Sequence, residues 1–170
     1  MSFEASSTSI EVLLVQIGNQ WLGIRTKRLV RLAPFSLTRL SPVPEELSTL
    51  LPALLGVVSQ ADNMPVIDLM TLLDLSLEAR PSSEQMMIIE YEGLAVAFVV
   101  QVAQEIERIN LKDIKLLPRL VEQSLLKPVV WAIWQRSAEE PIPLIEPTEA
   151  LSLSDWNFLM NLNNLLLIDI

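Results

Sequence analysis

Cysteine and histidine are both missing from the 170 residues. Without cysteine the chain has no disulfide, no thiolate nucleophile and no cysteine-based metal site. Without histidine it lacks the side chain used most often for general acid–base catalysis and transition-metal binding, and it cannot itself carry a phosphohistidine. These two absences remove most kinds of catalytic and metal centre. We therefore predict a protein that is not an enzyme and that needs no metal and no cofactor.

Glycine is also scarce, with four in the chain, so no glycine-rich phosphate loop can be built. The sequence contains neither a G-x-S-x-G elbow nor an S-x-x-K motif. Adjacent carboxylates occur at Glu45-Glu46 and Glu139-Glu140, beside prolines, and neighbouring side chains of this kind point apart. They are interpreted as surface charge, which leaves a carboxylate-based hydrolase without support.

No apolar run approaches the roughly 20 residues that a membrane-spanning helix needs. Residues 1–9 lack a basic region followed by an apolar stretch, so we expect no secretory signal, no membrane insertion and a cytoplasmic protein. Apolar residues make up 51% of the chain. This fraction is ample for a buried core in one ordinary domain or two very small ones.

Charge is unevenly distributed along an acidic chain. The net charge of −9 argues against nucleic acid or anionic lipid as a partner. Between Glu11 and Glu45, however, there is no acidic residue. Two interpretations stay open for this basic window, an ordinary solvated face or a docking patch for an acidic protein surface. Its cations are Arg25, Lys27, Arg28, Arg31 and Arg39.

A β-hairpin pattern occurs twice. Residues 10–17 (IEVLLVQI) and 20–24 are apolar runs joined by Gly18-Asn19, and the first is apolar on both faces. The pattern returns about 75 residues later, in residues 85–91 and 94–102 around Glu92-Gly93. A short segment of mixed charge and apolar residues follows each hairpin. The repeat predicts two similar β units that share a core; two unrelated hairpins in a larger β fold are the alternative.

The remaining segments are short and separated by prolines. We predict a mainly β barrel or sandwich and no βαβ winding. A polar connection at 76–84 is expected to join the halves, and Asn110 is expected to cap a helical turn. Residues 121–128 are a helix or a loop. The further strands are expected at 54–59, 64–68, 129–135 and 142–145, and short helices at 45–51 and 69–75.

The last segment is typical of an amphipathic helix. Ser154 is the expected N-cap, and Asn157, Asn161 and Asn164 form one polar stripe. The helix either packs on its own domain or docks on a partner or a second copy. The apolar residues that would dock are Trp156, Phe158, Leu159 and Leu162.

The order of these segments resembles the CheW-like family of bacterial chemotaxis proteins, over residues 10–151. The resemblance rests on the opening hairpin at 15–24, on Pro42-Val43-Pro44, on Gly56-Val57-Val58 and on the block Pro65-Val66-Ile67-Asp68-Leu69. Val96 to Val100 followed by Glu105-Ile106 adds a second-half strand and bend. The block P-V-I-D-L after Gly56 is the most specific part.

The resemblance implies two small SH3-like five-stranded β-barrels within residues 10–151, after a flexible stretch at 1–9 and before a C-terminal helix at 152–170. It also implies a non-catalytic adaptor of two-component signalling that controls motility. The expected partners are a methyl-accepting chemoreceptor and a CheA-like histidine kinase. In the family a groove between the barrels receives the receptor helix, and barrel ends bind the kinase.

Departures from the family pattern fall on the expected interface. The usual Asn-Leu-Arg-Gly is replaced by Ser59-Gln60-Ala61-Asp62-Asn63, Arg31 stands where an acidic residue is common, and Gln101 stands where Asp is frequent. The fold is thus expected to be kept and the interface recast, for example in pilus-based motility or phototaxis. The alternative is a ligand-binding or inhibitory module that no longer couples receptor to kinase. The candidate partner-binding residues are Arg28, Leu29, Arg31, Gly56, Val57, Gln60, Asp62, Ile67 and Ala103.

Overall fold

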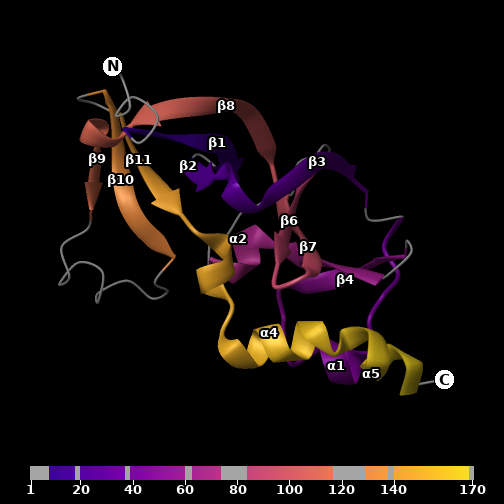
Figure 1. Ribbon diagram of the computed structural model, residues 1–170. Coiled ribbons are helices and arrows are strands. Elements are labelled where there is room, and N and C mark those ends of the chain that lie inside the picture. The colour runs from indigo at the N-terminus through magenta and orange to yellow at the C-terminus, as the bar shows by residue number, and fades with distance from the viewer. Residues whose placement is uncertain are drawn as a thin grey trace. The chain divides into compact units, whose positions relative to one another are not determined.

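The computed structural model in Figure 1 describes residues 8–17, 20–36, 39–59, 63–73, 84–116, 129–137 and 140–168. The chain divides into two compact units, each built from two separate stretches of sequence. Unit 1 consists of Met1–Arg28 and Val102–Ala150, and unit 2 consists of Leu29–Gln101 and Leu151–Ile170.

Unit 1 contains one six-stranded sheet in the order β8-β1-β2-β11-β10-β9. Neighbouring strands are antiparallel except β11 and β2, which run parallel. The strands are β1 (Ser9–Ile17), β2 (Gln20–Arg25), β8 (Val102–Asn110), β9 (Ile114–Leu116), β10 (Val130–Ser137) and β11 (Glu140–Ile145). Its 3₁₀ turns are η1 (Thr26–Arg28), η3 (Leu111–Asp113) and η4 (Pro147–Ala150).

Unit 2 contains a five-stranded sheet in the order β3-β6-β7-β5-β4, again with one parallel pair, β5 and β7. The strands are β3 (Leu29–Phe35), β4 (Leu54–Ser59), β5 (Asn63–Asp68), β6 (Glu84–Tyr91) and β7 (Leu94–Val100). The helices are α1 (Glu45–Ser48), α2 (Leu69–Leu72), α4 (Leu153–Met160) and α5 (Leu162–Ile168). The predicted mainly β fold is confirmed.

The two sheets follow one strand plan, which agrees with the repeat read from the sequence. In each, a hairpin (β1-β2 or β6-β7) is joined through a parallel pair to a second hairpin (β11-β10 or β5-β4). The strand that follows each first hairpin along the chain pairs with the other hairpin: β3 follows β2 but pairs with β6, and β8 follows β7 but pairs with β1. The two sheets thus exchange one strand each.

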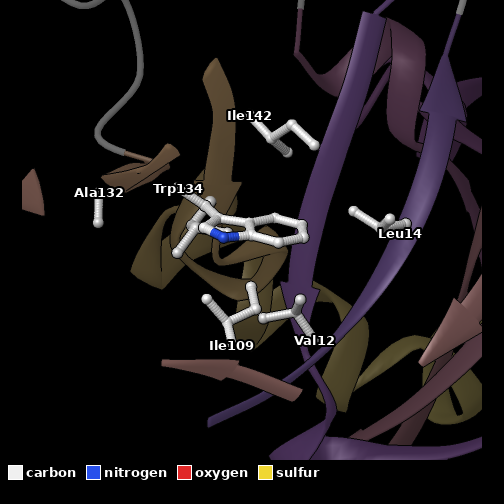
Figure 2. Packing of buried hydrophobic residues seen from close by; sticks show 7 residues of the cluster. Val12, Leu14, Ile109, Ala132, Trp134 and Ile142 are labelled. Carbon is white, nitrogen blue, oxygen red and sulfur yellow. The ribbon is translucent and has the colours of Figure 1, made fainter. Parts of the chain in front are cut away.

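Each unit has its own apolar core. In unit 1, β1 is buried on both faces from Val12 to Val15, as its continuous apolar run predicts. Figure 2 shows the Trp134 ring among the surrounding aliphatic side chains. The cluster comprises Val12, Leu14, Ile109, Ala132, Trp134, Ile142 and Leu144. In unit 2 the corresponding cluster comprises Met64, Val66, Met86, Ile88, Ala97 and Val99.

Two glycines in unit 2 are fixed by backbone geometry. The turn between β6 and β7 has φ of 52° at Glu92 and 81° at Gly93, and two consecutive positive values favour a tight hairpin with the native strand twist. A Cβ at Gly56 would lie 2.7 Å from the Ser41 carbonyl oxygen. The close approach allows Ser41 and Val57 to exchange two backbone hydrogen bonds, of 2.8 and 3.0 Å.

The C-terminal segment corrects one prediction and confirms another. Ser152, and not Ser154, caps α4. The Asp155 amide donates to the Ser152 hydroxyl at 3.1 Å, and the Ser152 amide donates to the Asp155 carboxylate at 2.9 Å. This reciprocal pair satisfies two free backbone amides, so Ser154 falls inside the first turn. The stripe of Asn157, Asn161 and Asn164 is exposed as predicted, and the helix is interrupted at Asn161.

The helix packs within unit 2. Trp156, Leu159 and Leu162 are each at most 5% exposed, and the Trp156 ring stacks on Tyr91 with centroids 4.2 Å apart. Phe158 is half-buried. These side chains are engaged in the core of their own unit, which favours the first of the two alternatives for this segment.

Several predictions fall partly outside the described residues. These are the flexible stretch at 1–9, the connection at 76–84, the segment 121–128, and Gln60 and Asp62. The expected cap at Asn110 is confirmed, because its side chain accepts from the Lys112 amide at 3.1 Å. Within the described residues, no helix combines the length and apolar character that crossing a membrane requires.

Candidate protein-binding surfaces

Strand β3 carries two of the predicted partner-binding residues at the edge of a sheet. Leu29 is half-buried and Arg31 is exposed. Among the described strands, β3 pairs only with β6, so its other edge is open. An open edge presents unpaired backbone donors and acceptors to an extended partner, and its exposed side chains can contact a partner of any shape.

A bulge changes which side chains β3 exposes. Leu29 pairs with Ile89 and Arg31 with Ile88, so Val30 is an extra residue on β3. The usual alternation is broken here, and Val30, Arg31 and Leu32 are all exposed in succession. Val30 is 56% and Leu32 37% exposed. Two apolar side chains with a cation between them form a surface that suits an amphipathic partner with acidic residues.

Gly56, Val57 and Ile67 lie together on the paired strands β4 and β5 of unit 2. Val57 is 2% and Ile67 0% exposed, so their side chains belong to the core. Gly56 provides the close backbone approach to Ser41 described above. These residues position β4 and β5, and their contact with a partner stays a prediction.

The other predicted residues are distributed elsewhere. Arg28 ends η1 and is exposed, and Ala103 is half-buried on β8, where it pairs with Val15; both belong to unit 1. Gln60 and Asp62 lie outside the described residues, between the paired residues Ser59 and Asn63. Of the predicted set, the described members in unit 2 thus form two groups, Leu29 and Arg31 on β3 and Gly56, Val57 and Ile67 on β4 and β5.

Sequence reasoning missed a pairing of an arginine with a tryptophan in unit 1. The Arg25 guanidinium carbon lies 4.7 Å from the centroid of the Trp131 ring. The residues are far apart along the chain, and only the order β2-β11-β10 brings their strands near each other. The basic window that contains Arg25 was the one signal in the sequence. A second such pair in the same unit, Arg136 over Trp134, has a distance of 5.7 Å.

Ion pairs on unit 1 are weak surface features. Arg108 and Glu11 are 3.5 Å apart across β8 and β1, and Arg136 and Glu107 are also 3.5 Å apart. The Arg108 side chain is 72% exposed, and pairs of this kind contribute about 0–1 kcal/mol. In the part of the chain that the structure describes, no three acidic side chains converge to hold a metal ion.

Comparison with known proteins gives this arrangement a family. The model of the CheW-like domain matches residues 11–154. The chain belongs to the CheW-like domain family. Members of this family are scaffolds without catalytic activity, so this CheW-like chain is a chemotaxis-type scaffold domain and not an enzyme.

A solved structure shows the same fold. The scaffolding protein TtCheW from Thermoanaerobacter tengcongensis matches with a TM-score of 0.66 at 15% identity, over 81% of this chain and 88% of that one. At this identity the likeness concerns the fold alone. The search of curated protein sequences found no significant match.

The family assignment gives the altered segment at 59–63 a place in the CheW-like fold. Ser59 pairs with Asn63, so residues 60–62 connect β4 to β5. The polar stretch that replaces the family's Asn-Leu-Arg-Gly is therefore the connection of one hairpin in unit 2. The part of this connection in partner binding stays a prediction.

Proposed function

We propose that this CheW-like chain is an adaptor that couples chemoreceptors to a CheA-like histidine kinase in a motility pathway. The match of the family model over residues 11–154 is the observation that carries the proposal. TtCheW, which shares the fold, is described as a scaffolding protein. The adaptor is proposed to act in the cytoplasm, where kinase and receptor signalling domains meet.

The open edge of β3 is the surface proposed to contact the receptor. Its exposed apolar residues, Val30 and Leu32, supply area that a partner buries, and each is held on a paired strand instead of a loop. Arg31 lies between them and is exposed. A charge at the rim of an interface acts mainly on the rate of association. Arg31 therefore speeds the association of an acidic partner more than it slows dissociation.

Reconstitution tests the adaptor role directly. The full chain is mixed with the CheA-like kinase and a receptor signalling fragment from the same genome, and a ternary complex is measured by co-sedimentation together with kinase autophosphorylation. An adaptor assembles the two and changes kinase activity in their presence. If the chain binds either partner but never both, coupling is absent and the inhibitory or ligand-binding module becomes the better description.

Reversal of one charge tests the β3 surface. Arg31→Glu should slow association with the receptor fragment by about tenfold at low salt and weaken its dependence on salt, because attraction becomes repulsion. Surface plasmon resonance at two ionic strengths gives both quantities. Arg39→Glu is the matched control, since Arg39 is also exposed, lies in unit 2 and undergoes the same change of charge. Equal slowing by both variants would show a general charge effect and no β3 contact.

A further inference from the structure

Unit 1 has a hollow between the start of β1 and the end of β2. Its volume is about 250 Å³, and its lining residues are Ile10, Glu11, Arg25, Thr26 and Lys27. Pockets for whole small-molecule ligands typically occupy roughly 300–1,000 Å³. This hollow lies below that range, and a single side chain fits within it.

The hollow is positively charged in a protein that is acidic overall. Arg25 and Lys27 line it, and in the part of the chain that the structure describes neither makes an ion pair. The one lining carboxylate, Glu11, is already paired with Arg108. When Arg108 is counted with Arg25 and Lys27, the cations outnumber the carboxylate of Glu11. The net local charge is therefore positive and attracts a negative group. Ile10 adds an apolar wall, against which methylene groups can pack.

Arg25 is held in place by an aromatic ring that a bulge presents. Val130 pairs with Ile145 and Ala132 with Leu144, so Trp131 is the extra residue on β10. An extra residue re-aims its side chain, and here the Trp131 ring lies under the Arg25 guanidinium at 4.7 Å. A guanidinium that stacks on a ring by its face keeps its N–H groups, which lie in its plane, available for a carboxylate. The ring therefore already orders Arg25 in the free protein, so less side-chain entropy is lost when a partner binds.

We infer that the hollow formed by Ile10, Glu11, Arg25, Thr26 and Lys27 is a binding site for an acidic side chain, most simply a glutamate, of a protein partner. The carboxylate pairs with Arg25 and Lys27, the Thr26 hydroxyl adds a donor, and the methylenes lie on Ile10. This inference depends on the proposed adaptor role in one respect: the side chain that binds here in the cell belongs to a protein partner. It lies in unit 1, and the β3 edge lies in unit 2.

A carboxylate fits this site better than a phosphate does. Ile10 offers apolar surface beside the cations, and the methylenes of a glutamate side chain can cover it. Inorganic phosphate has no methylenes to do so. The occupant is thus an acidic side chain with an apolar stem.

Titration of the isolated full chain with a short polyglutamate peptide tests the site without any natural partner. Amide and indole NMR signals are followed at low salt, with polyglutamine of the same length for comparison. The expected response is a shift of the amides of Ile10, Glu11, Thr26 and Lys27, and of the Trp131 indole N–H. That indole nitrogen is buried and has no hydrogen-bond partner among the described residues, so it reports movement of Arg25 above its ring.

Two variants of equal charge separate the site from general attraction. Arg25→Ala should weaken polyglutamate binding about tenfold, as loss of a charge-assisted contact predicts. Arg136→Ala removes the same charge from the other Arg-over-Trp pair of unit 1, away from the hollow lining, and should change the affinity less than about twofold. Glu11→Gln should tighten binding, because it removes the one lining carboxylate.

Three results would overturn the inference. One is an equal loss in the Arg25 and Arg136 variants, and another is a set of shifts that maps to β3 with no change at the hollow. The third is a stronger response of the same amides to inorganic phosphate than to polyglutamate, which would assign the site to phosphate. None of these three results changes the outcome of the reconstitution with kinase and receptor. Failure of this site can therefore be distinguished from failure of the adaptor role.

Discussion

Unit 1 and unit 2 share a strand plan and differ in what is added to it. Both join a first hairpin to a second one through a parallel pair, and each accepts the strand that follows the other's hairpin. Unit 1 adds a sixth strand, β9, and two arginines that stack on tryptophans. Unit 2 adds α4 and α5, whose Trp156 stacks on Tyr91. The shared strand order determines the fold. The added strand, arginine–tryptophan pairs and helices determine which surfaces are available to partners.

The apolar cores of the two units also differ in the side chains that fill them. The unit 1 cluster is built around one large ring, Trp134, whereas that of unit 2 contains the flexible side chains of Met64 and Met86. Methionine adapts its shape to irregular spaces, and a tryptophan ring does not. We therefore expect unit 2 to tolerate substitutions within its strands better than unit 1, provided that its C-terminal helix stays docked.

The largest effects are expected from the two buried tryptophans, one in each unit. Trp134→Ala and Trp156→Ala should each lower the free energy of unfolding by about 3–5 kcal/mol, because each leaves a cavity. Urea unfolding measures the loss. Hydrogen exchange then shows whether protection falls in β10 and β11 for Trp134→Ala and around Tyr91 for Trp156→Ala.

Leu153→Ala is the control for the unit 2 variant, since Leu153 lies on the same helix and is 77% exposed. Its effect should stay within about 0.5 kcal/mol. If both tryptophan variants remove protection uniformly from every strand, the two units unfold as one and the comparison between them has no thermodynamic meaning.

A smaller effect is expected from Gly56 of unit 2, where the backbone of Ser41 approaches closely. Gly56→Ala should cost about 1–3 kcal/mol, because the new Cβ would meet the Ser41 carbonyl oxygen at 2.7 Å and backbone must move. Thermal unfolding gives the value. Gly93→Ala is the matched change, with no atom within 4 Å of its Cβ and only the strain of a φ of 81°. A larger loss at Gly93 than at Gly56 would contradict the proposed contact.

The smallest effect concerns the two first-hairpin turns. In unit 1 the residues between the paired Ile17 and Gln20 are Gly18 and Asn19, whereas unit 2 has Glu92 at a φ of 52°. Because Asn adopts this conformation more readily than Glu, Glu92→Asn should stabilise the protein by about 0.5 kcal/mol. Chemical denaturation resolves such a gain. Glu90→Asn, the same change in the extended strand β6, should bring no gain, and a gain there would discredit the turn explanation.

Local sequence predicted most of the individual elements. The hairpins, the Glu92-Gly93 turn, the strands β4, β5, β10 and β11 and the Asn110 cap depend on neighbouring residues, and each is found close to its predicted bounds. The misplaced cap illustrates the limit of such signals. Ser152 and Ser154 are both plausible caps, and the choice depends on which one has an acidic residue three positions later to complete the reciprocal hydrogen bonds.

The candidate surfaces were predicted less completely. The sequence pointed to Leu29 and Arg31, but the exposure of Val30 depends on a bulge that becomes visible only when β3 is aligned with β6. Likewise, Val57 and Ile67 look like any apolar contact residue until their burial is known. Register and burial are properties of a strand and its neighbours, so a single strand's sequence does not contain them.

By itself the sequence determined the mainly β class, which follows from apolar periodicity and turn residues, and its segment order and motifs resembled the family. It left open whether the two hairpins are a repeat or are unrelated. Only the tertiary structure decided the rest. The exchange of β3 and β8, the seating of Arg25 on Trp131 and the packing of the last helix on Tyr91 each join residues that are far apart along the chain. Such contacts form when whole strands pair and bury apolar area together, and no local pattern records which strands those will be.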